Sequence, residues 1–188
     1  MSRIIYDHQQ VDRFTVGTVG LPGERAFFIQ AASAIGLNTI AIEKNQVMAL
    51  AERLKELIKD LRRGELASFD ELGIAATVDS APLEFPIEED FQAGVIGFTW
   101  EGGTQRITIE IQAITEISEQ ELLSADTDIS DIDDPPDLLR ASLRIYQVRG
   151  FCERALSLVA AGRQPCPFCG LPINPEGHLC PRANGYRR

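Results

Sequence analysis

The chain begins with short apolar runs separated by turn residues. Two β-prone runs, 13–19 (RFTVGTV) and 24–32 (ERAFFIQAA), flank residues 20–23 (GLPG), and a third run covers 37–43 (LNTIAIE). A Pro-Gly pair between two such runs predicts a turn, because proline presets φ and glycine accepts a positive φ. The three runs together predict an antiparallel meander.

The hydrophobic period changes after residue 43. Five apolar residues then follow one another at spacings of three and four: Val47, Leu50, Leu54, Leu57 and Leu61. This spacing is typical of an amphipathic helix, and the charged residues on its other face are expected to be solvated. Asn45 is placed to cap the start of this helix and Gly64 to end it.

The second half of the chain repeats this alternation of strand and helix patterns. Residues 66–90 form a connection that contains proline and acidic residues. Two β-prone runs at 93–101 and 105–117 are joined by a Gly-Gly pair, which favours a hairpin. Beyond an acidic stretch, apolar residues at helical spacing from Leu138 to Val159 predict one long helix. Cys152 lies on this stripe, so we expect a buried thiol.

These elements predict an α+β fold. We expect an antiparallel sheet of five or six strands packed against two helices, with a short C-terminal zinc-binding appendage. The expected organisation is a sheet with one helix over 1–117, an acidic linker over 118–136, a long helix completing the main domain over 137–162, and a zinc-ribbon or knuckle-like tail over 163–188.

Charge excludes some function classes. The 188 residues carry a formal net charge of −10, which argues against a body that wraps nucleic acid or lies on an anionic membrane. No apolar run reaches the ~18 residues of a membrane span, and the polar start does not suggest a signal peptide, so a cytoplasmic protein is expected.

The acidic stretch also contains Asp126, Asp128 and Asp131, whose spacing is similar to that of a calcium-binding loop. The glycine and the closing glutamate of such a loop are missing, which favours a linker.

The C-terminal segment carries the strongest chemical signal. Cys166 and Cys169 form a C-x-x-C pair, and His178 and Cys180 form a second pair. Two close pairs of sulfur and nitrogen ligands are typical of one tetrahedral, structural zinc ion. A disulfide framework and a thioredoxin-like motif fit the context less well. If Glu176 or water replaced the histidine, the site could be open and reactive.

Several cationic residues are candidates for binding. After the last zinc ligand, the tail carries Arg182, Asn184, Tyr186, Arg187 and Arg188. Such residues can hold nucleic acid by phosphate contact and stacking, or can dock on the acidic stretch of the same chain. Arg13, Arg25 and Arg106, on predicted strands, could line a pocket for an anionic ligand. His8 is expected at the surface, and residues 17–23 are a weak candidate for a phosphate cradle.

Two segments, 17–31 (GTVGLPGERAFFIQA) and 166–188 (CPFCGLPINPEGHLCPRANGYRR), resemble a conserved bacterial family of unknown function, mainly from actinobacteria. The resemblance runs over nearly the whole chain, and the four candidate zinc ligands match the family's tail pattern. It implies one part of a trio, beside a lipid-kinase-like and a histidine-phosphatase-like protein. That association hints at phosphorylated molecules.

The sequence favours a non-catalytic binding or adaptor protein with a structural zinc site and a protein partner. No Walker-type loop, nucleophile elbow or zinc-protease motif is present in the sequence. Two alternatives remain open. One is an enzyme or ligand-binding protein for a phosphorylated or other anionic small molecule, and the other is nucleic-acid binding through the basic tail.

Overall fold

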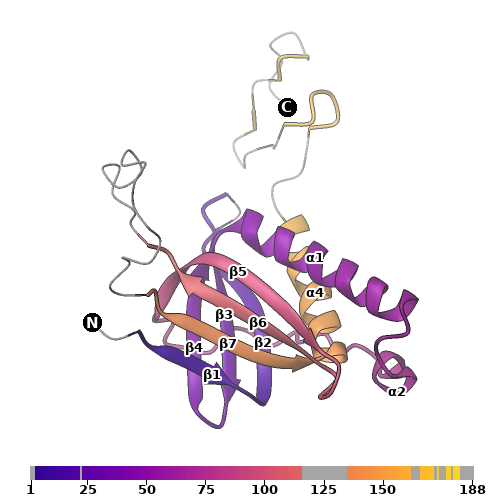
Figure 1. Cartoon of the computed structure of the whole chain (residues 1–188). Coiled ribbons are helices and arrows are strands. Elements are labelled where there is room, and N and C mark those ends of the chain that lie inside the picture. Colours follow the sequence, from indigo (N-terminus) through magenta and orange to yellow (C-terminus); the bar gives the residue numbers. More distant parts are fainter. Residues whose placement is uncertain are drawn as a thin grey trace, which may run out of the picture.

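Seven strands form one sheet with the order β1-β7-β6-β5-β4-β3-β2 (Figure 1). The computed structural model describes residues 3–21, 23–115, 135–161, 166–171, 173, 177–178 and 180–182. The strands are β1 (Ile5–His8), β2 (Val11–Val19), β3 (Ala26–Ser33), β4 (Gly36–Ile42), β5 (Phe91–Glu101), β6 (Arg106–Ala113) and β7 (Leu138–Arg144). Three helices lie within the described residues: α1 (Lys44–Arg63), α2 (Phe69–Gly73) and α4 (Ile145–Ala160).

The sheet is mixed, so the expectation of an antiparallel sheet of five or six strands against two helices is wrong. The β2–β3–β4 meander and the β5–β6 hairpin are antiparallel, as predicted. However, β4 pairs with β5 in parallel, and β1 pairs with β7 in parallel. Parallel neighbours need a crossover, and the chain between β4 and β5, including α1, supplies the first one.

Helix α1 confirms the predicted stripe and corrects its cap. Val47, Leu50, Leu54 and Leu61 are buried, as the spacing required. The helix begins at Lys44, before the predicted cap Asn45, because the backbone N–H of Glu43 is satisfied by Oε1 of Gln46 at 3.0 Å. It ends before Gly64, the predicted stop.

The predicted helix over 137–162 is wrong in its first third. Residues 138–144 form strand β7, and helix α4 begins only at Ile145. Leu139, Ala141 and Leu143 are all fully buried at a spacing of two, while β7 pairs with β6 on one side and β1 on the other. Pairing on both edges therefore overrides the helix propensity of leucine, alanine and arginine.

The core lies between the sheet and the helices α1 and α4, which pack against each other on one side of it (Figure 1). Its largest fully buried aliphatic side chains are Ile29, Ile40, Leu54, Ile107, Ile109, Ile111, Leu139, Leu143 and Ile145. None of the helices among the described residues combines the length and the hydropathy of a transmembrane segment.

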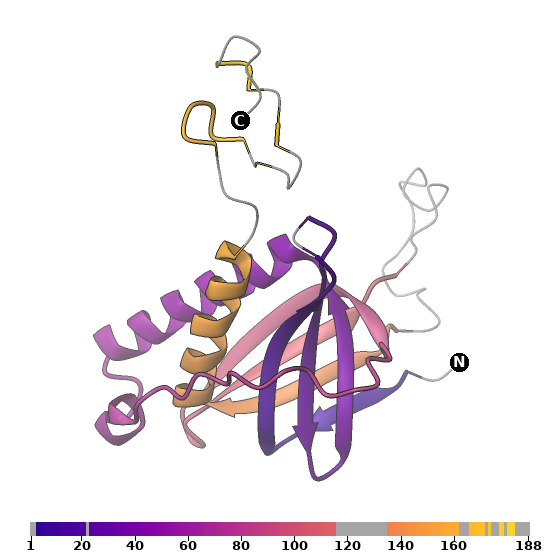
Figure 2. The same cartoon turned by 180° about the vertical axis from the view of Figure 1, so that it is seen from behind.

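An extended segment, residues 74–90, crosses the other side of β2 to β4 and is called the strap (Figure 2). The Gln30 amide anchors it, donating to the Glu84 carbonyl at 3.0 Å and accepting from the Glu84 N–H at 2.8 Å. A Cβ on Gly17 would collide with Leu83 of the strap. A glycine in β2 therefore permits the close approach of the strap to the sheet.

Candidate metal centre

The first two cysteines lie in a tight turn at the start of the tail, residues 163–188. The N–H of Gly170 donates to the carbonyl of Cys166 at 2.8 Å, and the N–H of Cys166 donates to the carbonyl of Leu171 at 2.8 Å. Gly170 has a φ of +76°, a conformation that glycine adopts at little cost. This turn explains why a glycine follows the C-x-x-C pair, and it brings both sulfur atoms to one side.

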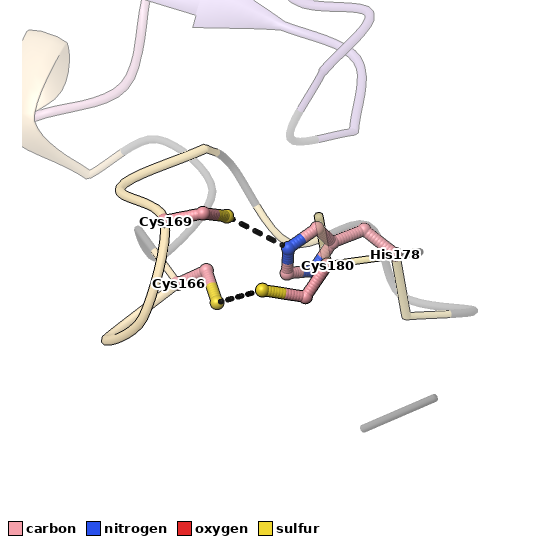
Figure 3. Close-up of side chains that lie close together, drawn as sticks. All are labelled: Cys166, Cys169, His178 and Cys180. Carbon is pink, nitrogen blue, oxygen red and sulfur yellow. Dashed lines mark hydrogen bonds between the residues drawn. The ribbon is translucent and has the colours of Figure 1, made fainter. Parts of the chain in front are cut away.

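The second pair of residues meets the first (Figure 3). The Sγ atoms of Cys166 and Cys180 lie 3.8 Å apart, and Sγ of Cys169 lies 3.2 Å from Nε2 of His178. One donor atom from each of the four residues lies within 4.8 Å of every other. Cys166 and Cys180 are buried, and Cys169 and His178 are partly exposed. The structure therefore assembles all four residues that the sequence singled out.

The local electrostatics shifts the pKa values of Cys166 and Cys169 in opposite directions. Burial disfavours the Cys166 thiolate, but the backbone N–H groups of Cys169 and Phe168 outweigh this effect, so the pKa of Cys166 is lowered. Burial raises the pKa of Cys169, and the neighbouring Cys180 and Cys166 thiols act in the same direction. Both shifts describe free thiols, whereas a bound cation stabilises every thiolate.

The spacing of the donors fits a metal ion. A tetrahedral site with metal–sulfur bonds of about 2.3 Å has sulfur–sulfur edges of about 3.8 Å, which matches the separation of Cys166 and Cys180. Nε2 of His178 faces Sγ of Cys169, while Nδ1 is buried without a hydrogen-bond partner among the described residues. The cluster could hold a metal ion.

The basic end of the tail is described only in part. Nη1 of Arg182 donates to the carbonyl of Phe168 at 3.4 Å. This hydrogen bond connects the segment after Cys180 to the turn that contains Cys166 and Cys169. The other predicted tail contacts, Asn184, Tyr186 and Arg187, lie outside the described residues, as does Glu176. The acidic stretch that contains the calcium candidates also lies outside them.

The three arginines proposed for an anionic ligand contact different parts of the body. Nε of Arg13 donates to Asp79 of the strap at 2.7 Å. Arg25 donates to the backbone carbonyl that follows α4 at 3.0 Å. Arg106 donates to the carbonyl of Ser142 in β7 at 3.0 Å. The structure thus gives each guanidinium its own partner and does not bring the three together.

His8 is placed differently from the expectation. It is fully buried rather than at the surface, with Nδ1 2.8 Å from Oγ of Ser33 and Nε2 2.9 Å from Oδ1 of Asn38. Because a carbonyl oxygen only accepts, Nε2 carries the proton and Nδ1 accepts from the serine. Burial lowers the pKa of His8, which keeps the ring neutral. Strand β1 was not predicted, so no local pattern indicated that His8 is buried.

The remaining cysteine confirms its prediction. Cys152 is 1 % exposed on the inner face of α4, and burial raises its pKa to about 12. A thiol with such a pKa is protonated at neutral pH and is a poor nucleophile.

A protein-family model with the description Protein of unknown function (DUF3090) matches residues 6–180. The matched segment includes the whole sheet except the first residue of β1, and all four residues of the metal cluster. No curated protein and no solved structure matches the chain.

Proposed function

The chain belongs to the DUF3090 family, and we propose that it is a non-catalytic binding protein whose tail is folded by one structural zinc ion. The observation that carries this proposal is the cluster of three sulfur donors and one imidazole nitrogen within 4.8 Å of one another. Cys166, Cys169, His178 and Cys180 are the proposed ligands. A protein is the proposed partner.

The donor set supports zinc over other metals. Thiolate and imidazole ligands in a tetrahedral arrangement favour zinc, whereas calcium and magnesium prefer oxygen ligands. Iron–sulfur clusters usually take four cysteines, and the described part of the tail offers three cysteines beside its histidine.

Four protein donors also support a closed site. A catalytic zinc ion keeps one position for water or substrate and takes three protein ligands, whereas a structural zinc ion takes four. A tail of this size cannot bury a sufficient core by itself, so the metal supplies the free energy that folds it.

The environment of the two other candidate groups supports a non-catalytic role. His8 is fully buried between Ser33 and Asn38, so its ring nitrogens are both engaged. Cys152 is buried as a neutral thiol. Neither group is accessible for acid–base or nucleophilic chemistry on a substrate.

The metal assignment is tested by metal analysis and X-ray absorption of the full chain, purified without a chelator or an affinity tag. We expect one zinc ion per chain, with three sulfur ligands and one nitrogen ligand. C169S should lower the zinc content, while C152A, which removes a core thiol outside the tail, should keep it. A chain without zinc, or a zinc shell containing an oxygen ligand, would contradict the closed site.

The binding role has a separate test. Wild type and the C169S/C180S variant, immobilised at equal density, are compared for the proteins that they retain from a lysate of the native host. We expect at least one protein that binds wild type and is lost with the variant. Identical sets of retained proteins would argue that the zinc-folded tail does not recognise a partner.

A further inference from the structure

A groove between α1 and α4 has four cations among its seven lining residues. Its volume is about 210 Å³, and its lining residues are Lys55, Ile58, Lys59, Arg62, Arg149, Cys152 and Glu153. Four cations therefore face one carboxylate, on a chain with a net charge of −10. We call this set of residues the basic groove. The sequence pattern alone assigned these α1 residues to a solvated helix face.

Within the part of the chain that the structure describes, the α1 cations of the groove have no ion-pair partner. Lys55, Lys59 and Arg62 lie at helical spacing on one stripe, and no described carboxylate oxygen lies within 4.0 Å of any of them. Arg63, which does not line the groove, pairs with Asp60 at 3.5 Å. Gathering like charges on one side of a helix disfavours the folded state unless an anion offsets the repulsion.

Arg149 completes the groove from the side of α4. Its Nη1 atom donates to the carbonyls of Leu72 and Ile74, at 3.4 and 3.0 Å, which fixes the guanidinium beside the end of α2. Among the described residues, Nε and Nη2 have no hydrogen-bond partner. The groove thus contains a positioned guanidinium whose Nε and Nη2 donors are available to a ligand.

The apolar part of the groove carries no negative charge that would repel an anion. Ile58 and Cys152 are both buried and line the groove between the charged side chains. Because the thiol of Cys152 is neutral at physiological pH, it adds no negative charge. An anion in this groove would meet cations from both helices over a partly apolar floor.

We propose that the basic groove binds the phosphate group of a small phosphorylated molecule. Guanidinium and ammonium groups converging from two helices suit a compact anion with several acceptor oxygens. The small volume favours one or two phosphate groups rather than an extended polyanion. The site lies outside the tail, so it goes beyond the zinc-dependent role proposed above and does not depend on it.

Isothermal titration calorimetry of the full chain with inorganic pyrophosphate, at physiological ionic strength, tests this proposal. We expect saturable binding of one pyrophosphate, weakened at least about tenfold in K59A/R62A, because each lost charge-assisted contact is worth about that factor. The matched control is K44A/R53A, which removes the same charge from exposed α1 positions outside the groove. This control should change the affinity less than about twofold.

Further measurements test whether a change in affinity comes from the groove itself. Thermal unfolding of each variant verifies that it folds, and R149K, which keeps the charge but removes the fork of donors, should also weaken binding. C169S should bind pyrophosphate like wild type, because the groove is independent of the metal cluster. Absence of binding, equal weakening by both double variants, or equal binding of sulfate would overturn the proposal.

Discussion

The body of the molecule, residues 3–161, buries large aliphatic side chains such as Ile109 and Leu139 without any exposure. In the tail, the buried positions among the described residues are Cys166 and Cys180, which are two of the four candidate metal ligands. The body is therefore stabilised by its own hydrophobic core, whereas the proposed function makes the folding of the tail depend on a bound ion. A change in the core should therefore lower the stability of the body and leave the cluster intact. A change in the cluster should unfold the tail and leave the body folded.

The largest expected effect comes from removing a buried ligand of the tail. In C180S the metal loses a thiolate, and because zinc binding supplies about 10–16 kcal/mol in small zinc modules, the tail should unfold. Limited proteolysis should then cleave the tail rapidly and leave the body intact. Thermal unfolding of the body provides the control, and a large fall in its Tm would mean that body and tail are coupled.

The converse perturbation acts on the core. L139A leaves a cavity in the core at strand β7 and should lower the free energy of unfolding by about 2–5 kcal/mol. Urea unfolding measures this loss, while metal analysis of the folded variant should still find a full complement of zinc. V95A, at an exposed position of β5, is the matched control and should change stability little.

A third, smaller effect tests whether contact with the strap outweighs helix propensity at Gly150. A Cβ at Gly150 in α4 would collide with the carbonyl of Thr77 in the strap. G150A should therefore destabilise the body by about 1–3 kcal/mol, although propensity alone predicts a gain from alanine in a helix. In G97A nothing lies within 4 Å of the new Cβ, so this control should remain close to wild type. A stabilised G150A would refute the role of the strap.

The smallest expected effect is a pH dependence within the body. Burial lowers the pKa of His8 in the folded state, whereas the unfolded chain keeps a value near 6.5. The unfolded state thus binds more protons between these two pKa values, and the free energy of unfolding should fall as the pH drops through about 6.5. Urea titrations of the body from pH 8 to 5 should show this slope in wild type and less of it in H8Q. Equal slopes would exclude His8 as the cause.

The sequence predicted the local features of the body well. The meander, the β5–β6 hairpin and the stripe of α1 each have a period or a turn that a short window contains. The metal cluster was predictable for a similar reason, because its ligands come in two close pairs along the chain.

The errors arise where distant segments decide the structure. Leu139, Ala141 and Leu143 could belong to a helix or a strand, and only pairing with β6 and β1 selects the strand. The burial of His8 depends on Ser33 and Asn38, which lie 25 and 30 residues away. The basic groove similarly needs α4 to lie beside α1. No local pattern encodes these contacts.

The most direct test of the account compares the amide spectrum of the full, isotope-labelled chain before and after zinc is removed by a chelator. We expect the amide chemical shifts of the tail, residues 166–182, to move to the values of an unfolded chain, while the shifts of β2 to β7 remain unchanged. Restoring zinc should bring the tail signals back. An unchanged tail, or loss of the sheet signals with the metal, would contradict the claim that the ion folds the tail alone.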